Sequence, residues 1–209
     1  MESPTSKIRT AMYKVVGEHA LDFTSAVYGD LLTRLLPQVK EGDWHTNTLI
    51  LPFTFTCAAA LEATLNDHLV AYTFNVFGLE NYRRQAEALL TLSLRAKLDS
   101  VVPLLSANRF VIRTDSVHYI SLSKLISTRN DLVHSKSFFV EGVVFNEDDR
   151  TVTFNSRIRE KTDARVIRQV DSALVTAFYS ALRSLDEDFF YLLEGSCRLS
   201  ANKLIKDAR

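Results

Sequence analysis

The stretch PFTFTCAAALEATLNDHLVAYTFNVF, residues 52–77, is free of glycine and has no proline after its first position. Apolar side chains recur in it at steps of about three and four residues, at Phe55, Ala58, Leu65, Leu69, Tyr72 and Val76. This spacing predicts an amphipathic helix from Pro52, which a first turn tolerates, to Phe77, with Gly78 as its end. Because such a helix must bury its apolar stripe against another element, the stretch favours a helical bundle.

Four further segments have helical spacing. The first begins near Ser3 and Pro4 and is ended by Pro37, and the next runs from about Glu80 towards Leu98. A third contains LSKLISTRNDLVHSK at residues 122–136, and the last runs from about Asp163 to the glycine at 195. The intervening VVPLLSANRFVIRTD has a proline and no sustained period, so we expect it to be irregular with at most a short helix.

The pattern changes to β-branched and aromatic residues in FFVEGVVF and TVTF, which flank the turn-forming NEDDR. The sequence therefore predicts a mainly all-α fold, an up-and-down bundle of about five helices with a small β-hairpin inserted before the last long helix. We expect one domain over 1–209, with a helical extension at 1–40, a core at 48–136, the hairpin at 138–156 and the last helix at 163–194.

Composition narrows the class of protein. Apolar residues make up 46% of the 209, which is enough for a core, and 25 basic residues balance 25 acidic ones. Bulk charge therefore predicts no polyanionic partner. The two cysteines lack metal-ligand spacing, and we see neither a signal peptide nor an apolar run long enough for a membrane span. We expect a cytoplasmic protein without a metal or other cofactor.

A charge interrupts the apolar stripe of residues 122–136. At about 100° per residue, one arc of the helix contains Leu122, Leu125, Ile126, Leu132 and Val133, and Arg129 falls near its centre. An unpaired guanidinium removed from water costs several kcal/mol, so Arg129 needs an anion, a carboxylate or a wet interface. Glu62 lies inside the stripe of residues 52–77 by the same arithmetic. One interpretation is therefore a buried Glu62–Arg129 ion pair.

A second interpretation places Arg129, Asn130 and His134 together at a surface cleft. Asn130 and His134 share a helical face, whereas Arg129 lies about 140° from His134, so its long arm or a second subunit must bring them together. Such a set suits RNA cleavage without a metal. A neutral histidine takes the proton of a ribose 2′-OH, and an arginine holds the scissile phosphate as its charge grows.

The six residues RNDLVH, 129–134, resemble the signature of the HEPN superfamily, which has an Arg, then a polar residue that is often Asn or Asp, and a His after four to six intervening positions. The resemblance covers about residues 48–136. It includes the leucine-rich approach VHYISLSKLIST, and ALEATLNDHL looks like an earlier acidic helix of the family.

The resemblance implies a helical bundle that forms a symmetric homodimer, with two motifs facing each other in one composite RNA-cleaving site. If the resemblance holds, His134 is the general acid or base and Arg129 binds the phosphate or the transition state. Asn130 is then an orienting residue, and we assign Glu62 the role of orienting Arg129. Members of the family often act as toxins, which implies an antitoxin partner, or in phage defence. Others have lost activity and serve as dimerisation or binding modules.

Other residues carry weaker signals. Arg157, Arg159, Lys161 and Arg165 form a candidate RNA-binding patch, for which a solvated helix start is an equally good explanation. A second Arg-to-His pair at the motif's spacing, RTDSVH at residues 113–118, lacks the Asn and a helical setting. His68 follows Asn66 and Asp67 and is read as part of the polar edge of its helix rather than as a metal ligand.

Overall fold

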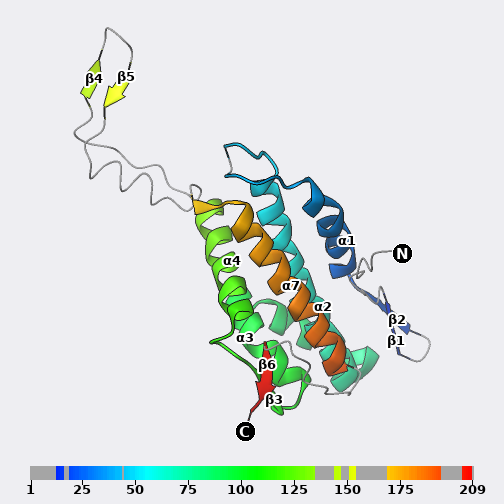
Figure 1. Ribbon diagram of the computed structural model, residues 1–209. Helices are drawn as coiled ribbons and strands as arrows, with labels where there is room; N and C mark the ends of the chain where they lie inside the picture. The colour runs from blue at the N-terminus through cyan, green and yellow to red at the C-terminus, as the bar shows by residue number, and fades with distance from the viewer. Residues whose placement is uncertain are drawn as a thin grey trace, which may run out of the picture.

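The computed structural model describes residues 13–16, 19–43, 45–134, 144–146, 151–153, 169–193 and 204–208. These residues contain five α-helices: α1 (Ser25–Leu35), α2 (Ile50–Leu90), α3 (Leu94–Leu105), α4 (Val117–Val133) and α7 (Ser172–Leu193). Figure 1 shows α4 and α7 side by side and antiparallel, with α1 on the other side of α7. The predicted mainly helical fold is confirmed, as is the small antiparallel sheet before the last helix.

Helix α2 forms the centre of the core. Its most deeply buried side chains are Ile50, Phe53, Cys57, Leu61, Leu65 and Leu69, each at most 1% exposed. This face is rotated from the predicted stripe, because Phe55 and Val76 are exposed and Glu62 is only half-buried. The helix is apolar on several sides, at Ala58–Ala60 for example, so apolar spacing alone does not fix which side faces inward.

Gly78 kinks helix α2 but does not end it. Its φ of 71° and ψ of 174° are not helical, and the rings of Phe74 and Tyr82 meet edge to face across the kink, 5.4 Å apart. The helix then continues to Leu90, so the predicted helix from Glu80 towards Leu98 is divided between α2 and α3. Ser93 accepts a hydrogen bond from the backbone N–H of Ala96 and so caps the start of α3. Helix α3 extends through VVPLL, which belongs to the segment expected to be irregular with at most a short helix.

The expected long first helix is wrong between residues 13 and 22. There, β1 (Tyr13–Val16) pairs antiparallel with β2 (His19–Asp22), and helix α1 begins only at Ser25. The start is set by a distant residue, since Asp67 Oδ2 on α2 accepts a 2.7 Å hydrogen bond from the backbone N–H of Ser25. A short 3₁₀ turn, Leu36–Gln38, follows and contains the predicted terminator Pro37. The first twelve residues lie outside the described ranges.

The remaining strands form two more two-stranded sheets. The predicted hairpin is present as β4 (Val144–Asn146) and β5 (Thr151–Thr153), whereas the pairing of β3 (Phe110–Ile112) with β6 (Ile205–Asp207) was not expected. Asp171 caps helix α7 by accepting from the N–H of Leu174, and the predicted start near Asp163 lies outside the described residues. No helix in the described ranges is long and apolar enough to cross a membrane.

Helix α7 carries a buried carboxylate with an unpaired oxygen. Asp188 is 8% exposed, and among the described residues its Oδ2 atom has no hydrogen-bond partner. Burial, reinforced by the charge of Glu187, raises the pKa of Asp188 to about 7. The folded chain therefore keeps a proton on Asp188 between about pH 4 and pH 7, where the unfolded chain has lost it. Folding stability should fall as the pH rises through this window and level off above it.

Replacing Asp188 by Asn should remove much of this loss, because the amide has the shape of the neutral acid and does not ionise. At pH 8 we expect Asp188→Asn to be more stable than the wild type by on the order of 2–4 kcal/mol, and at pH 4 to differ little. Thermal unfolding followed by circular dichroism at pH 4, 5, 6, 7 and 8 measures this. Asp30→Asn, on an exposed position of α1, is the control. Parallel pH profiles for Asp188→Asn and the wild type would show that Asp188 is not held neutral.

Candidate functional site

Helix α4 is fixed along most of its length before it reaches the motif. Ser116 caps its start by accepting from the N–H of Tyr119, and Leu122, Leu125 and Ile126 are buried in the core. Helices α2 and α7 pack against it. This packing makes α4 a rigid support for whatever its last turn carries.

A polar network also joins α4 to α3. Arg95 Nη1 donates to Tyr119 Oη at 3.2 Å and to Ser123 Oγ, and Tyr119 Oη donates to Asp99 Oδ1 at 2.8 Å. The guanidinium of Arg95 also stacks over the ring of Tyr119. The network therefore holds the first half of α4, opposite the end that carries the motif.

The motif occupies the last turn of α4, where the core ends. Arg129 is half-buried, and its Nη1 atom donates to Asn130 Oδ1 at 3.0 Å. Asn130 and His134 are exposed, and the backbone N–H of His134 donates to the carbonyl of Asn130 at 2.9 Å. His134 is the C-cap residue of the helix, with φ of −103° and ψ of 22°. The guanidinium is thus held by a neutral amide and the imidazole is open to solvent.

The ion pair between Glu62 and Arg129 is absent. Within the described part of the chain, neither side chain forms an ion pair, and the one side-chain hydrogen bond of Arg129 goes to Asn130. Both residues are half-buried. The predicted partnership assumed that two charges inside two apolar arcs would meet. The inward face of α2 is rotated away from Glu62, so this carboxylate lies at the margin of the helix's buried face.

Within one chain, the helical backbone keeps Arg129 and His134 apart. The two residues are five positions apart, so they lie about 7.5 Å apart along the helix axis and about 140° apart around it. Arg129 is hydrogen-bonded to the side chain of Asn130, and the backbone N–H of His134 is hydrogen-bonded to the carbonyl of Asn130. The arrangement can bind an anion at Arg129 and transfer a proton at His134, but to act on one phosphate it needs a second surface.

Several other predicted positions can also be placed. The candidate RNA-binding residues Arg157, Arg159, Lys161 and Arg165 lie outside the described residues. His68 is 5% exposed rather than on a polar edge: its Nδ1 lies 2.7 Å from the carbonyl oxygen of Thr64 and its ring lies 4.4 Å from that of Phe189. Across the described ranges, no group of three or more His, Cys, Asp or Glu side chains is placed to hold a metal ion.

Sequence reasoning did not single out the acidic positions of helix α7. Asp186 lines a small cavity between α1, α2 and α7, and Asp188 is buried on another flank of the helix. The available signal is the run LDEDFF, where three acids interrupt an otherwise apolar helical pattern. A charged residue directly beside a predicted core arc marks a position worth examining, as Arg129 did on α4.

The absence of the Glu62–Arg129 pair predicts the result of a double-mutant cycle. Glu62→Ala, Arg129→Ala and the double variant should show a coupling energy below about 0.5 kcal/mol, because the two side chains form no ion pair or hydrogen bond with each other. Urea unfolding of the four proteins measures it. A cycle on Arg95 and Ser123, which do bond, serves as the positive control. A Glu62–Arg129 coupling of 1 kcal/mol or more would restore the ion pair.

Comparison of this chain with protein-family models, curated proteins and solved structures finds no match. The likeness to the HEPN superfamily therefore stays an expectation based on RNDLVH, the preceding VHYISLSKLIST and the earlier ALEATLNDHL. What the site does must be argued from Arg129, Asn130 and His134.

Proposed function

We propose that this chain is a metal-independent endoribonuclease that acts in the cytoplasm as a homodimer, through a composite site built from Arg129 and His134 of both copies. The observation that carries the proposal is the state of the last turn of α4. Arg129 is bonded to the neutral Asn130 instead of a carboxylate, and the imidazole of His134 is exposed. A guanidinium with no carboxylate partner among the described residues can still pair with an incoming phosphate.

The chemistry follows from these two side chains. The imidazole of His134 accepts the proton of a ribose 2′-OH as its oxygen attacks the adjacent phosphorus. The bond from phosphorus to the 5′-oxygen of the next nucleotide breaks, which leaves a 2′,3′-cyclic phosphate, and the second His134 of the composite site, in its protonated form, donates a proton to the leaving oxygen. Arg129 binds the non-bridging oxygens, where negative charge grows in the transition state. Asn130 orients Arg129, and no metal takes part in any step.

A second copy of the chain would complete the site. Because Arg129 and His134 diverge around the helix axis, two motifs related by a two-fold axis can present the arginine of one copy beside the histidine of the other. The basic residues Arg157, Arg159, Lys161 and Arg165 would guide the RNA backbone. An unrestrained ribonuclease stops growth, so we place the chain in a toxin or phage-defence role with a protein that restrains it.

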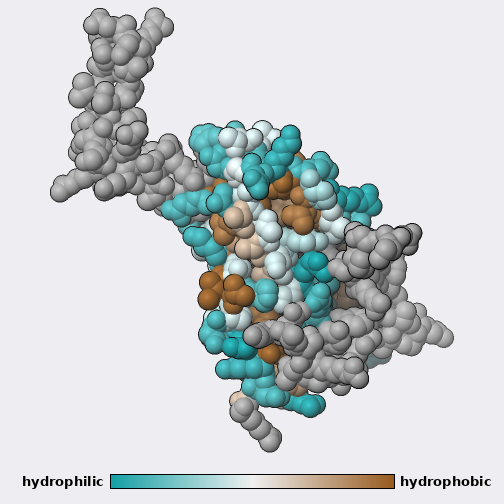
Figure 2. Space-filling model, viewed as in Figure 1, coloured by the Kyte–Doolittle hydropathy of each residue, from teal (hydrophilic) through white to brown (hydrophobic). Residues whose placement is uncertain are grey.

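One observation favours the alternative, a non-catalytic dimerisation or binding module. Figure 2 shows hydrophobic surface over the lower part of α4, where Val117 and Ile120 are 69% and 56% exposed, and Val133 beside His134 is 51% exposed. A helix that exposes apolar side chains along its length suits a contact surface. In this alternative the motif contributes to dimerisation only.

The proposed activity predicts RNA cleavage that survives EDTA. His134→Ala and Arg129→Ala should each lower the cleavage rate at least about 100-fold, because each removes a group that acts in the transition state. Cleavage of a mixed set of single-stranded and structured RNAs, resolved on denaturing gels, measures the rate. Circular dichroism and the elution volume of each variant establish that it is folded and has kept its oligomeric state.

The matched controls are Arg113→Ala and His118→Ala, which remove the Arg-to-His pair that has the motif's spacing without its setting. Arg113 lies before α4, where it pairs with Asp115 at 3.3 Å, and His118 is in the first turn. Both variants should keep wild-type activity. A purified dimer that leaves every RNA intact, or equal loss in control and motif variants, would reject the nuclease and favour the binding module.

A further inference from the structure

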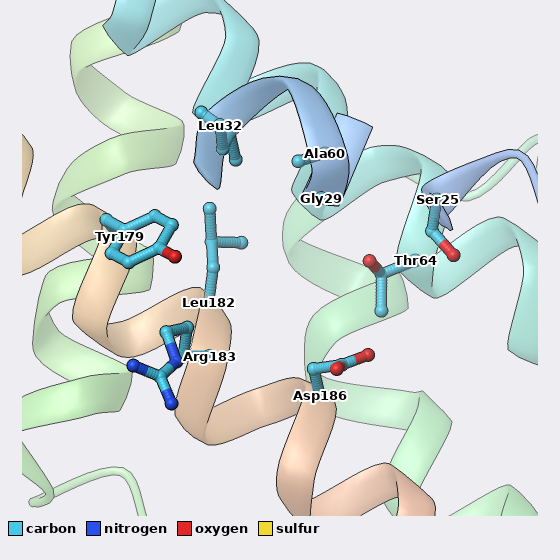
Figure 3. A pocket seen from close by; sticks show the side chains of 9 residues that line it. All are labelled: Ser25, Gly29, Leu32, Ala60, Thr64, Tyr179, Leu182, Arg183 and Asp186. Carbon is cyan, nitrogen blue, oxygen red and sulfur yellow. The ribbon is translucent and has the colours of Figure 1, made fainter. Parts of the chain in front are cut away.

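Helices α1, α2 and α7 enclose a small cavity at the surface of the bundle (Figure 3). Its volume is about 30 Å³, which is room for an ammonium-sized group, and it opens at the surface, so a longer ligand would extend outward along its walls. Leu32, Ala60 and Leu182 supply apolar walls, and Gly29 lets α1 approach without a side chain. The cavity lies on the opposite flank of α7 from α4, so it is separate from the motif.

An unpaired carboxylate opens into this cavity. Asp186 is partly buried and forms no hydrogen bond or ion pair with any described residue. Burial raises its pKa to about 6, with the charge of Glu187 adding to the rise and that of Arg183 opposing it. Figure 3 shows the guanidinium of Arg183 turned away from the carboxylate, and its Nη2 atom lies 3.5 Å from Glu187 Oε1. The cavity therefore presents a carboxylate that no described residue bonds.

The neighbouring polar groups are suited to accept hydrogen bonds. Ser25 and Thr64 lie with Asp186 on one side of the cavity in Figure 3. The backbone N–H of Ser25 bonds Asp67 Oδ2 at 2.7 Å, and the hydroxyls of Ser25 and Thr64 each carry lone pairs that can accept a hydrogen bond. A carboxylate beside free hydroxyl lone pairs favours a ligand that donates several hydrogen bonds and carries positive charge.

The residues that line the cavity favour an organic cation over a metal ion as its ligand. A metal ion prefers many oxygen ligands, whereas Asp186 is the only carboxylate that lines this cavity. Apolar walls of leucine and alanine stabilise methylene groups instead of a hydration shell. An ammonium group on an alkyl chain satisfies both sides of the cavity, since its three N–H donors match the acceptors and its chain matches the walls.

We propose that the cavity binds the primary ammonium group of an alkyl amine, with Asp186 as its counter-ion, Ser25 and Thr64 as hydrogen-bond acceptors, and Leu32, Ala60 and Leu182 packed against its methylene groups. The site does not depend on the motif of α4. Its ligand could be a free amine or the side chain of a lysine, which share this chemistry.

Butylamine is the probe, and butan-1-ol, which has the same chain without the charge, is its control. At pH 7.5, changes in the backbone amide NMR resonances of α1 and α7 should show butylamine binding with a dissociation constant of about 1 mM, as expected for a ligand of a few heavy atoms. Asp186→Asn should weaken this binding at least about tenfold, while Asp30→Asn on α1 leaves it unchanged. Equal binding of butylamine and butan-1-ol, or no change in Asp186→Asn, would overturn the proposal and leave a cavity that holds water only.

The pH dependence tests the wild-type chain itself. The charged groups that act on Asp186 are Arg183 and Glu187 on α7, and across the cavity Ser25 of α1 is bonded to Asp67 of α2. Only ionised Asp186 pairs with the ammonium group, so affinity should rise about tenfold from pH 5 to pH 7, with uptake of the amine releasing a proton. A flat profile contradicts the site. Tighter binding of 1,4-diaminobutane than of N-acetyl-lysine methylamide assigns the ligand to free amines, and the reverse order assigns it to a protein lysine.

Discussion

The burial of helix α2 is the constraint on which the rest of the structure depends. This helix packs against α1, α3, α4 and α7, so all the other described helices are held by the same central element. Its large side chains Phe53, Leu61 and Leu65 are almost fully removed from water, which gives the bundle its main source of stability. The polar contact from Asp67 to Ser25 then fixes where α1 begins against it.

Because α4 is anchored in this core through Leu122 and Leu125, its last turn is a rigid platform at the edge of the bundle. The motif lies where the packing ends, so Arg129 is half-buried and His134 is exposed. This position lets a firmly held helix present an imidazole and a guanidinium at the surface, as the proposed ribonuclease site requires. The apolar spacing of residues 122–136 indicated the helix and the unusual place of Arg129. It did not reveal that Asn130, a neighbour in sequence, would be its hydrogen-bond partner.

Helix α7 places two carboxylates in costly environments for different reasons. Asp186 and Asp188 are two positions apart and therefore point to flanks about 200° apart. Asp188 is buried with no described partner for its Oδ2 atom, whereas Asp186 lines the cavity beside α1 and α2. Acidic side chains held beside the core lower the free energy of unfolding at neutral pH, because they must ionise there or remain protonated. The proposed amine would supply the missing donor at Asp186, whereas the described residues provide none for Asp188 Oδ2.

The sequence by itself determined the helical class, the hairpin before the last helix and the helical setting of RNDLVH, because these follow from local periodicity and turn chemistry. Only the tertiary structure decided which face of α2 is buried, where α1 begins, that β3 pairs with β6, and that Glu62 does not reach Arg129. These features depend on contacts between residues far apart in the chain. Apolar spacing gives the face of a helix to within a wide arc, and the packing of neighbouring helices fixes its rotation.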